Sequence, residues 1–171
     1  MAPFFLFALF IMSLVLQGSV LALTGTSGIH PDLLLVIVVA LGLLSDSKRG
    51  AAVGLAAGLL QDILFGSPLG FFAFTKTLIG ATAGMLSDDI YKDYVLAPML
   101  LMIFFSAFSD FTTFLLARLY HIQQPYSLTF YMQQTSLIRL GMHFLIMGLI
   151  YPYLYRAQRH RLLFPHAEHN K

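Results

Sequence analysis

The sequence contains no cysteine and no tryptophan, and only 11% of its 171 residues are charged. Without cysteine, the chain can form no disulfide and has no thiolate for catalysis or metal binding. A soluble domain carries roughly 25% charged residues, so a soluble class is disfavoured. The formal net charge of +2 gives no basis for a nucleic-acid partner. The chain therefore has few charged groups that favour contact with water.

Hydrophobic residues are abundant instead: they make up 58% of the chain, and the mean hydropathy is +0.78. At about 20 residues per membrane-spanning helix, this length holds five or six helices and little else. We therefore expect an all-α integral membrane protein, a single six-helix transmembrane bundle covering residues 1–171. The expected spans are residues 3–23, 31–45, 50–65, 69–86, 94–118 and 136–155, followed by a cytoplasmic tail at 156–171.

The lysines and arginines near the span ends predict the orientation, because cytoplasmic loops of membrane proteins carry an excess of these residues. With six spans, one side receives Lys48, Arg49, Lys92, Arg156, Arg159 and Arg161. The other side receives only Arg118 and Arg139. The sequence therefore predicts a multi-pass protein with both termini in the cytoplasm.

A stripe of glycines runs through residues 50–70. Its members are Gly50, Gly54, Gly58, Gly66 and Gly70, with Asp62 at the same spacing of four residues. Residues spaced by four share one face of a helix, and glycines there let another helix come close. We interpret the stripe as a helix-packing face with Asp62 as its polar anchor. A direct chemical role for Asp62 is the alternative.

Four ionisable residues are expected inside the membrane: Asp62, Lys76, Asp110 and Arg139. Counting about 1.5 Å per residue from the span ends places all four in the outer half of the bundle. Buried charges persist when they are paired. We expect Lys76 to pair with Asp110 or Asp62, and Arg139 to pair with the remaining acid. Such a cluster could fix the helices or relay protons, and the first is favoured because paired acids resist titration.

No catalytic, cofactor-binding or metal-binding residues are predicted. The sequence has no G-x-G-x-x-G phosphate-binding loop. His143 is a lone histidine on the last expected span, and we interpret it as the partner in an interhelical hydrogen bond rather than as a ligand.

Residues 31–70 carry a motif by which the chain resembles the MreD family of rod shape-determining membrane proteins. The matching residues are Pro31-Asp32-Leu33-Leu34, Gly50, Gly54, Gly58-Leu59-Leu60-Gln61-Asp62, Gly66 and Leu69-Gly70. The resemblance implies a non-enzymatic subunit of the elongasome in the bacterial inner membrane. It also implies the family's partners: MreC, the MreB filament, the RodA glycosyltransferase and its class B penicillin-binding protein.

The family in turn resembles, in fold, the substrate-binding subunits of energy-coupling-factor vitamin transporters, which implies a pocket open to the outer side. Three functions therefore stay open. The glycine stripe and the small size favour a membrane scaffold. A vitamin-binding subunit lacks support, because there is no tryptophan to stack on a ring. An enzyme for a lipid-linked substrate would need Lys76 or Arg139 unpaired.

Overall fold

The computed structural model describes residues 2–24, 31–65, 68–88, 94–120 and 137–159. Within these ranges all regular secondary structure is helical, which confirms the predicted all-α class. The elements are α1 (Ala2–Thr24), α2 (Leu33–Leu43), α3 (Ser47–Phe65), α4 (Phe71–Met85), the 3-10 helix η1 (Leu86–Asp88), α5 (Leu96–Leu119) and α7 (Leu137–Arg159). Each of the six expected spans overlaps one of the six α-helices of these ranges, and four of these helices extend beyond the expected bounds by one to four residues at one or both ends.

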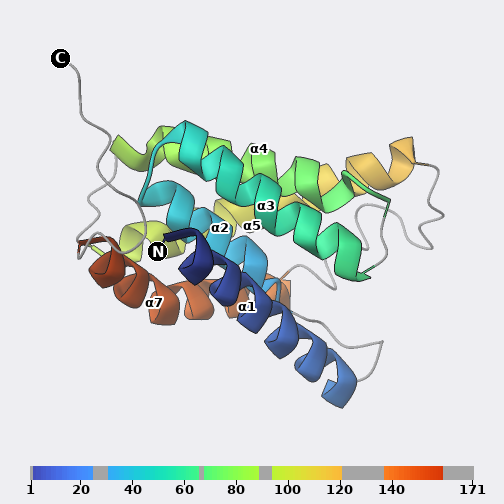
Figure 1. The fold of residues 1–171 in the computed structure, drawn as a ribbon, viewed down its shortest axis with the longest axis horizontal. Helices are drawn as coiled ribbons and strands as arrows, with labels where there is room; N and C mark the ends of the chain where they lie inside the picture. The colour runs from blue at the N-terminus through green and yellow to red at the C-terminus, as the bar shows by residue number, and fades with distance from the viewer. Residues whose placement is uncertain (1, 25–30, 66–67, 89–93, 121–136, 160–171) are drawn as a thin grey trace.

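Successive helices run in opposite directions between the two ends of the bundle (Figure 1). One end collects the start of α3 and the last turn of α7, and with them Lys48, Arg49, Arg156 and Arg159. We call this the basic end. The opposite end collects the start of α2, the end of α3 and the start of α4 (Figure 1).

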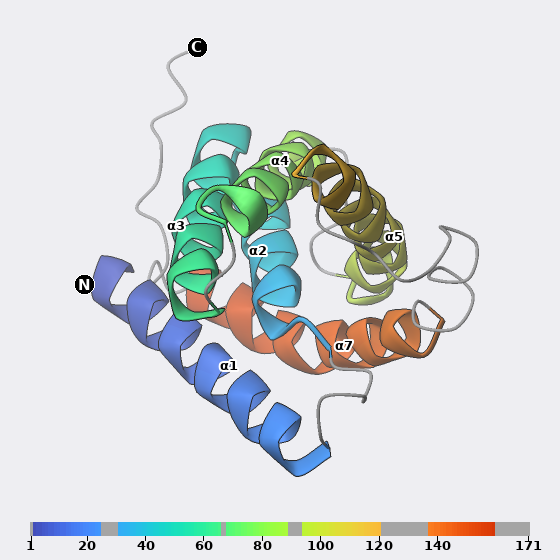
Figure 2. The same ribbon diagram turned by 90° about the vertical axis from the view of Figure 1, so that its right-hand side faces the viewer.

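Helix α2 is the centre of the bundle, and Figure 2 shows it between α3, α4 and α7. Every residue from Leu34 to Leu43 is buried. A helix that is apolar on all sides is stable only when other elements surround it. The uninterrupted apolar sequence of α2 therefore follows from its position, since α1, α3, α4, α5 and α7 all pack against it.

Among the described residues, two helices are long and apolar enough to cross a membrane by themselves. They are α5 and α7, whose most apolar 18-residue windows have mean hydropathies of 1.8 and 1.5. Helix α2 has 11 residues, about 16 Å at 1.5 Å per residue, against a hydrocarbon core of about 30 Å. It is therefore too short to cross alone, and the count of six membrane crossings stays a prediction.

Several sequence-based predictions concern residues outside the described ranges. Gly66 of the stripe, Lys92 and residues 160–171 of the tail belong to this group.

Candidate functional site

Helices α3 and α4 pack antiparallel with their backbones almost in contact. A Cβ added to Gly50 would collide with the carbonyl of Gly80, and one added to Gly54 would collide with the carbonyl of Lys76. A Cβ on Gly58 would lie 2.5 Å from the Phe72 carbonyl oxygen. The structure thus places these three glycines against α4, at positions where any side chain would push the two helices apart.

At the basic end, α4 also packs closely against α2 and against the turn before α3. A Cβ on Gly84 would lie 2.5 Å from the carbonyl oxygen of Asp46, in the turn before α3. A Cβ on Gly42 of α2 would lie 2.8 Å from the Cβ of Ala83. Small residues on α4 therefore bring α2 and α3 together on one side of the bundle.

Gly70 does not belong to this packing face, which corrects its inclusion in the stripe. It is the N-cap of α4, with a left-handed φ of 98°, and nothing lies within 4 Å of where its Cβ would be. Glycine adopts a positive φ at little cost. The conformation of the chain entering α4, rather than contact between helices, accounts for this glycine.

Asp62 caps α4 from the last turns of α3. Its carboxylate, on a residue that is 1% exposed, accepts hydrogen bonds from the backbone N–H groups of Gly70 (2.9 Å), Phe72 (2.8 Å) and Ala73 (3.1 Å). The first N–H groups of a helix have no partner within the helix, and a negative charge there is favourable. The Asp62 carboxylate therefore provides the cap that the Gly70 side chain cannot.

The partner of Lys76 is Asp32, which corrects the expected pairing with Asp110 or Asp62. Lys76 Nζ donates to Asp32 Oδ2 at 2.5 Å, and the lysine side chain is 1% exposed. The other carboxylate oxygen, Oδ1, accepts from the N–H of Leu35 at 2.8 Å and caps α2. Asp32 was not among the four charges expected inside the membrane, so its role as an ion-pair partner was missed.

Arg139 pairs with Asp110, one of the two acids considered for it, and this ion pair joins α7 to α5. The side chain of Asp110 is 7% exposed and that of Arg139 is 20% exposed. The Lys76–Asp32 pair joins α4 to the start of α2. The two ion pairs thus involve four helices.

His143 links α7 to both α2 and α5. Its Nε2 accepts a hydrogen bond from the backbone N–H of Asp32 at 2.8 Å, and its Nδ1 lies 2.7 Å from Ser106 Oγ. Because Nε2 is an acceptor, the neutral ring carries its proton on Nδ1, which donates to Ser106. This is the interhelical hydrogen bond expected from the sequence.

These polar groups surround a pocket at the opposite end from the basic one. Its volume is about 270 Å³, and Gln17, Asp32, Gln61, Phe72 and Arg139 are among the residues that line it. A neighbouring pocket of about 150 Å³ shares Asp32, Phe72 and Arg139 and adds His143. Polar side chains of α1, α3, α5 and α7 and of the N-cap residue of α2 therefore meet in one region.

The two glutamines that line the pocket of about 270 Å³ differ in their hydrogen bonding. With its amide oxygen turned toward α2, Gln17 accepts from the N–H groups of Leu33 (2.8 Å) and Leu34 (3.0 Å). Gln61 is 7% exposed, and its Oε1 has no hydrogen-bond partner in the part of the chain that the structure describes. A buried acceptor without a partner costs about 1–3 kcal/mol, and no pattern in the sequence indicated it.

Chemically, this arrangement holds helices in place. Within the described ranges, no three His, Asp or Glu side chains come together as a metal site. Each of the four charged residues predicted inside the membrane has a bonded partner: Asp62 on α4, Lys76 with Asp32, and Arg139 with Asp110. The polar residues thus connect α2, α3, α4, α5 and α7 to one another.

A family model described as rod shape-determining protein MreD matches residues 1–161 of the chain. The chain belongs to the MreD family. No curated protein and no solved structure matches it.

Membership assigns this MreD-family chain a role in rod shape determination and identifies it as a membrane protein, in agreement with the two apolar helices α5 and α7. The match covers the entire polar region described above. The glycines of α3, the cap by Asp62 and the two ion pairs therefore all lie within the matched part of the chain.

Proposed function

We propose that this chain is a non-enzymatic membrane scaffold of the rod elongasome, which binds MreC and helps to organise lateral peptidoglycan synthesis. The supporting observation is that the charged side chains within the bundle bond to other helices. Asp62 holds the start of α4, and the Lys76–Asp32 and Arg139–Asp110 pairs hold α4 to α2 and α7 to α5. They are well suited to holding a fixed shape.

A fixed shape favours binding of a second membrane protein. The α3–α4 contact leaves no room for a side chain at Gly54 or Gly58, so these helices have little freedom to shift. A surface that is already ordered loses less conformational entropy on association. On this proposal MreC contacts the bundle directly, and MreB, RodA and a class B penicillin-binding protein belong to the same complex.

The proposed setting is the bacterial inner membrane, with six crossings and both termini in the cytoplasm. The basic end supports this orientation, because Lys48, Arg49, Arg156 and Arg159 lie together there (Figure 1). Lysine and arginine near span ends mark the cytoplasmic side.

Co-purification with MreC in a mild detergent tests the scaffold. We expect MreC to be retained by the parent chain and lost from the double variant Gly54→Leu/Gly58→Leu, because leucines would force α3 from α4. The matched control is Gly18→Leu/Gly141→Leu, at two glycines where a Cβ would meet nothing within 4 Å. Absence of MreC from the parent preparation, with MreC co-expressed and inserted, would contradict the proposal.

A second candidate is a small-molecule binding subunit with the fold of the vitamin-transporter subunits. The pocket of about 270 Å³ favours it, as does the unpartnered Oε1 of Gln61. The test is mass spectrometry of small molecules retained by the purified chain, with riboflavin, thiamine and biotin as probes. Retention of one probe at a one-to-one ratio, abolished by Gln61→Leu, would favour this function over the scaffold.

A further inference from the structure

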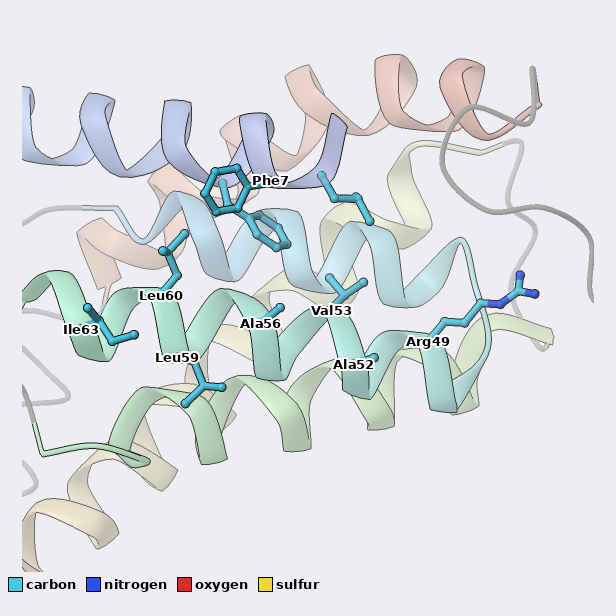
Figure 3. Close-up of a pocket in the computed structure, with 10 residues that line it drawn as sticks. Phe7, Arg49, Ala52, Val53, Ala56, Leu59, Leu60 and Ile63 are labelled. Atoms are coloured by element: carbon cyan, nitrogen blue, oxygen red, sulfur yellow. The ribbon is translucent and has the colours of Figure 1, made fainter. Parts of the chain in front are cut away.

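A third cavity, which is apolar, lies between α1 and α3. Its volume is about 530 Å³, and hydrocarbon side chains form nearly all of its lining. Phe7 and Phe10 of α1 form one wall, and exposed small residues of α3, Ala52 and Ala56, lie along the other (Figure 3). Within the described residues α1 packs mainly on α2, so α3 keeps this face uncovered.

This cavity is an open groove, and its two ends differ in charge. Its α3 side runs from Ile63 to Arg49, and Figure 3 shows the Arg49 guanidinium extending beyond the apolar side chains at one end. Fourteen residues of helix cover about 21 Å. One leaflet of the hydrocarbon core is about 15 Å thick, half of the full core. The groove is therefore long enough to hold a complete acyl chain of one leaflet.

The charged end of the groove is cationic overall. Lys48 and Arg49 adjoin it, and Arg49 Nε lies 3.5 Å from Asp46 Oδ2, so these three residues together carry one positive charge. The last turn of α7, with Arg156 and Arg159, lies at the same end of the bundle (Figure 1). Clusters of basic residues beside membrane-embedded surfaces attract anionic headgroups.

The apolar lining and the cationic end of the groove together suit an anionic lipid, whose acyl chain matches the lining and whose headgroup matches the charge. We propose that this groove binds an acyl chain of an anionic phospholipid, with the lipid phosphate against Arg49. The lipid comes from the leaflet at the basic end and covers the face of α3 that α1 leaves open.

Native mass spectrometry of the full chain, purified in detergent with equal amounts of phosphatidylglycerol and phosphatidylcholine, tests this assignment. We expect one retained lipid, with phosphatidylglycerol preferred at least fivefold, since one basic contact with an anionic membrane is worth about fivefold in affinity. Arg49→Gln should abolish the preference. Arg49→Gln/Asp46→Asn should abolish it too, which separates loss of the arginine from repulsion by the remaining carboxylate.

Ala56→Phe places a ring inside the groove and should remove the retained lipid, while the exposed position makes misfolding no concern. Leu55→Phe is the matched control for Ala56→Phe, because Leu55 is exposed and does not line the groove, and it should behave as the parent. Equal retention of the two lipids by the parent would overturn the proposal. So would lipid retention by Ala56→Phe at the parent level. Loss of a co-expressed single-span partner from Ala56→Phe, with lipid retention unchanged, would identify a partner helix as the occupant and also overturn it.

Discussion

Asp32 bonds simultaneously to Lys76 of α4 through one carboxylate oxygen and to the first turn of α2 through the other. The His143 ring accepts from the backbone N–H of the same residue. One residue therefore positions the start of the central helix relative to both α4 and α7. We expect the stability of the bundle to depend on this residue more than its position in a short interhelical turn would suggest.

The Lys76–Asp32 pair should show strong coupling in a double-mutant cycle. Lys76→Met leaves a partly buried carboxylate without its partner, and Asp32→Asn leaves a buried ammonium, while asparagine keeps the cap on α2. Breaking one side of a buried pair costs about 3–5 kcal/mol. The double variant should therefore lose less than the two single losses combined, by about 1–3 kcal/mol. Thermal unfolding in detergent measures this coupling, and strictly additive losses would contradict the pairing.

The contact between α3 and α4 at Gly54 should not accommodate even a methyl side chain. Gly54→Ala should destabilise the protein by about 1–3 kcal/mol, the usual cost of overpacking, because the Lys76 carbonyl cannot move away. Gly141→Ala on α7 is the control, where the added methyl meets open space and alanine's better helix propensity should be neutral or slightly favourable. Equal melting temperatures for the two variants would rule out the tight contact.

Removal of the Asp62 cap should weaken α4 specifically. Asp62→Ala leaves three backbone N–H groups without their acceptor and should cost at least about 1–2 kcal/mol, the range for loss of a helix cap. Asp62→Asn keeps one acceptor oxygen and should lose less. Asp88→Ala, at an exposed acid in η1, should change the unfolding midpoint little. Hydrogen exchange at residues 70–73 should rise in Asp62→Ala, and unchanged exchange there would count against the cap.

At Gln61, in contrast to the positions above, we expect a substitution to stabilise the protein. Gln61→Leu removes the buried acceptor that has no partner among the described residues and should raise the unfolding free energy by about 1–3 kcal/mol. Gln61→Glu, which buries a charge at the same place, should lower it. If Gln61→Leu is instead clearly less stable than the parent in purified form, then the amide oxygen has a bound partner.

The orientation can be measured directly because the natural chain has no cysteine. Lys48→Cys and Arg118→Cys each introduce a single thiol at an exposed position, and the two lie at opposite ends of the bundle. In intact cells, a membrane-impermeant maleimide should label Arg118→Cys and leave Lys48→Cys unlabelled. Labelling at Lys48→Cys alone would invert the proposed topology.

Much of the fold could be predicted from the sequence, because apolar runs between polar turns determine where helices begin and end. The glycines at positions 50, 54 and 58 also pointed to a close helix contact, since fourfold spacing and small size are local properties. The position of α2 at the centre is a property of the whole bundle. It became visible only when five other helices were placed around it.

The partner of Lys76 could not be predicted for a related reason. Residue counting gives the depth of a charge, but it does not say which helices are neighbours. Asp32 lies 44 residues from Lys76 and was not among the four charges expected inside the membrane. Gly70 was misassigned because its spacing continued the stripe, whereas the helix had already ended and a left-handed residue was needed there.

The central helix α2 is shorter than the α-helices that pack against it. At 1.5 Å per residue, α2 is about 16 Å long and α5 about 36 Å, so the central helix is about 20 Å shorter than α5. The pocket that Asp32 lines lies where α2 begins, with Gln17, Gln61 and Arg139 of longer helices around it. The short central helix thus leaves space at one end of the bundle that polar rather than apolar side chains surround.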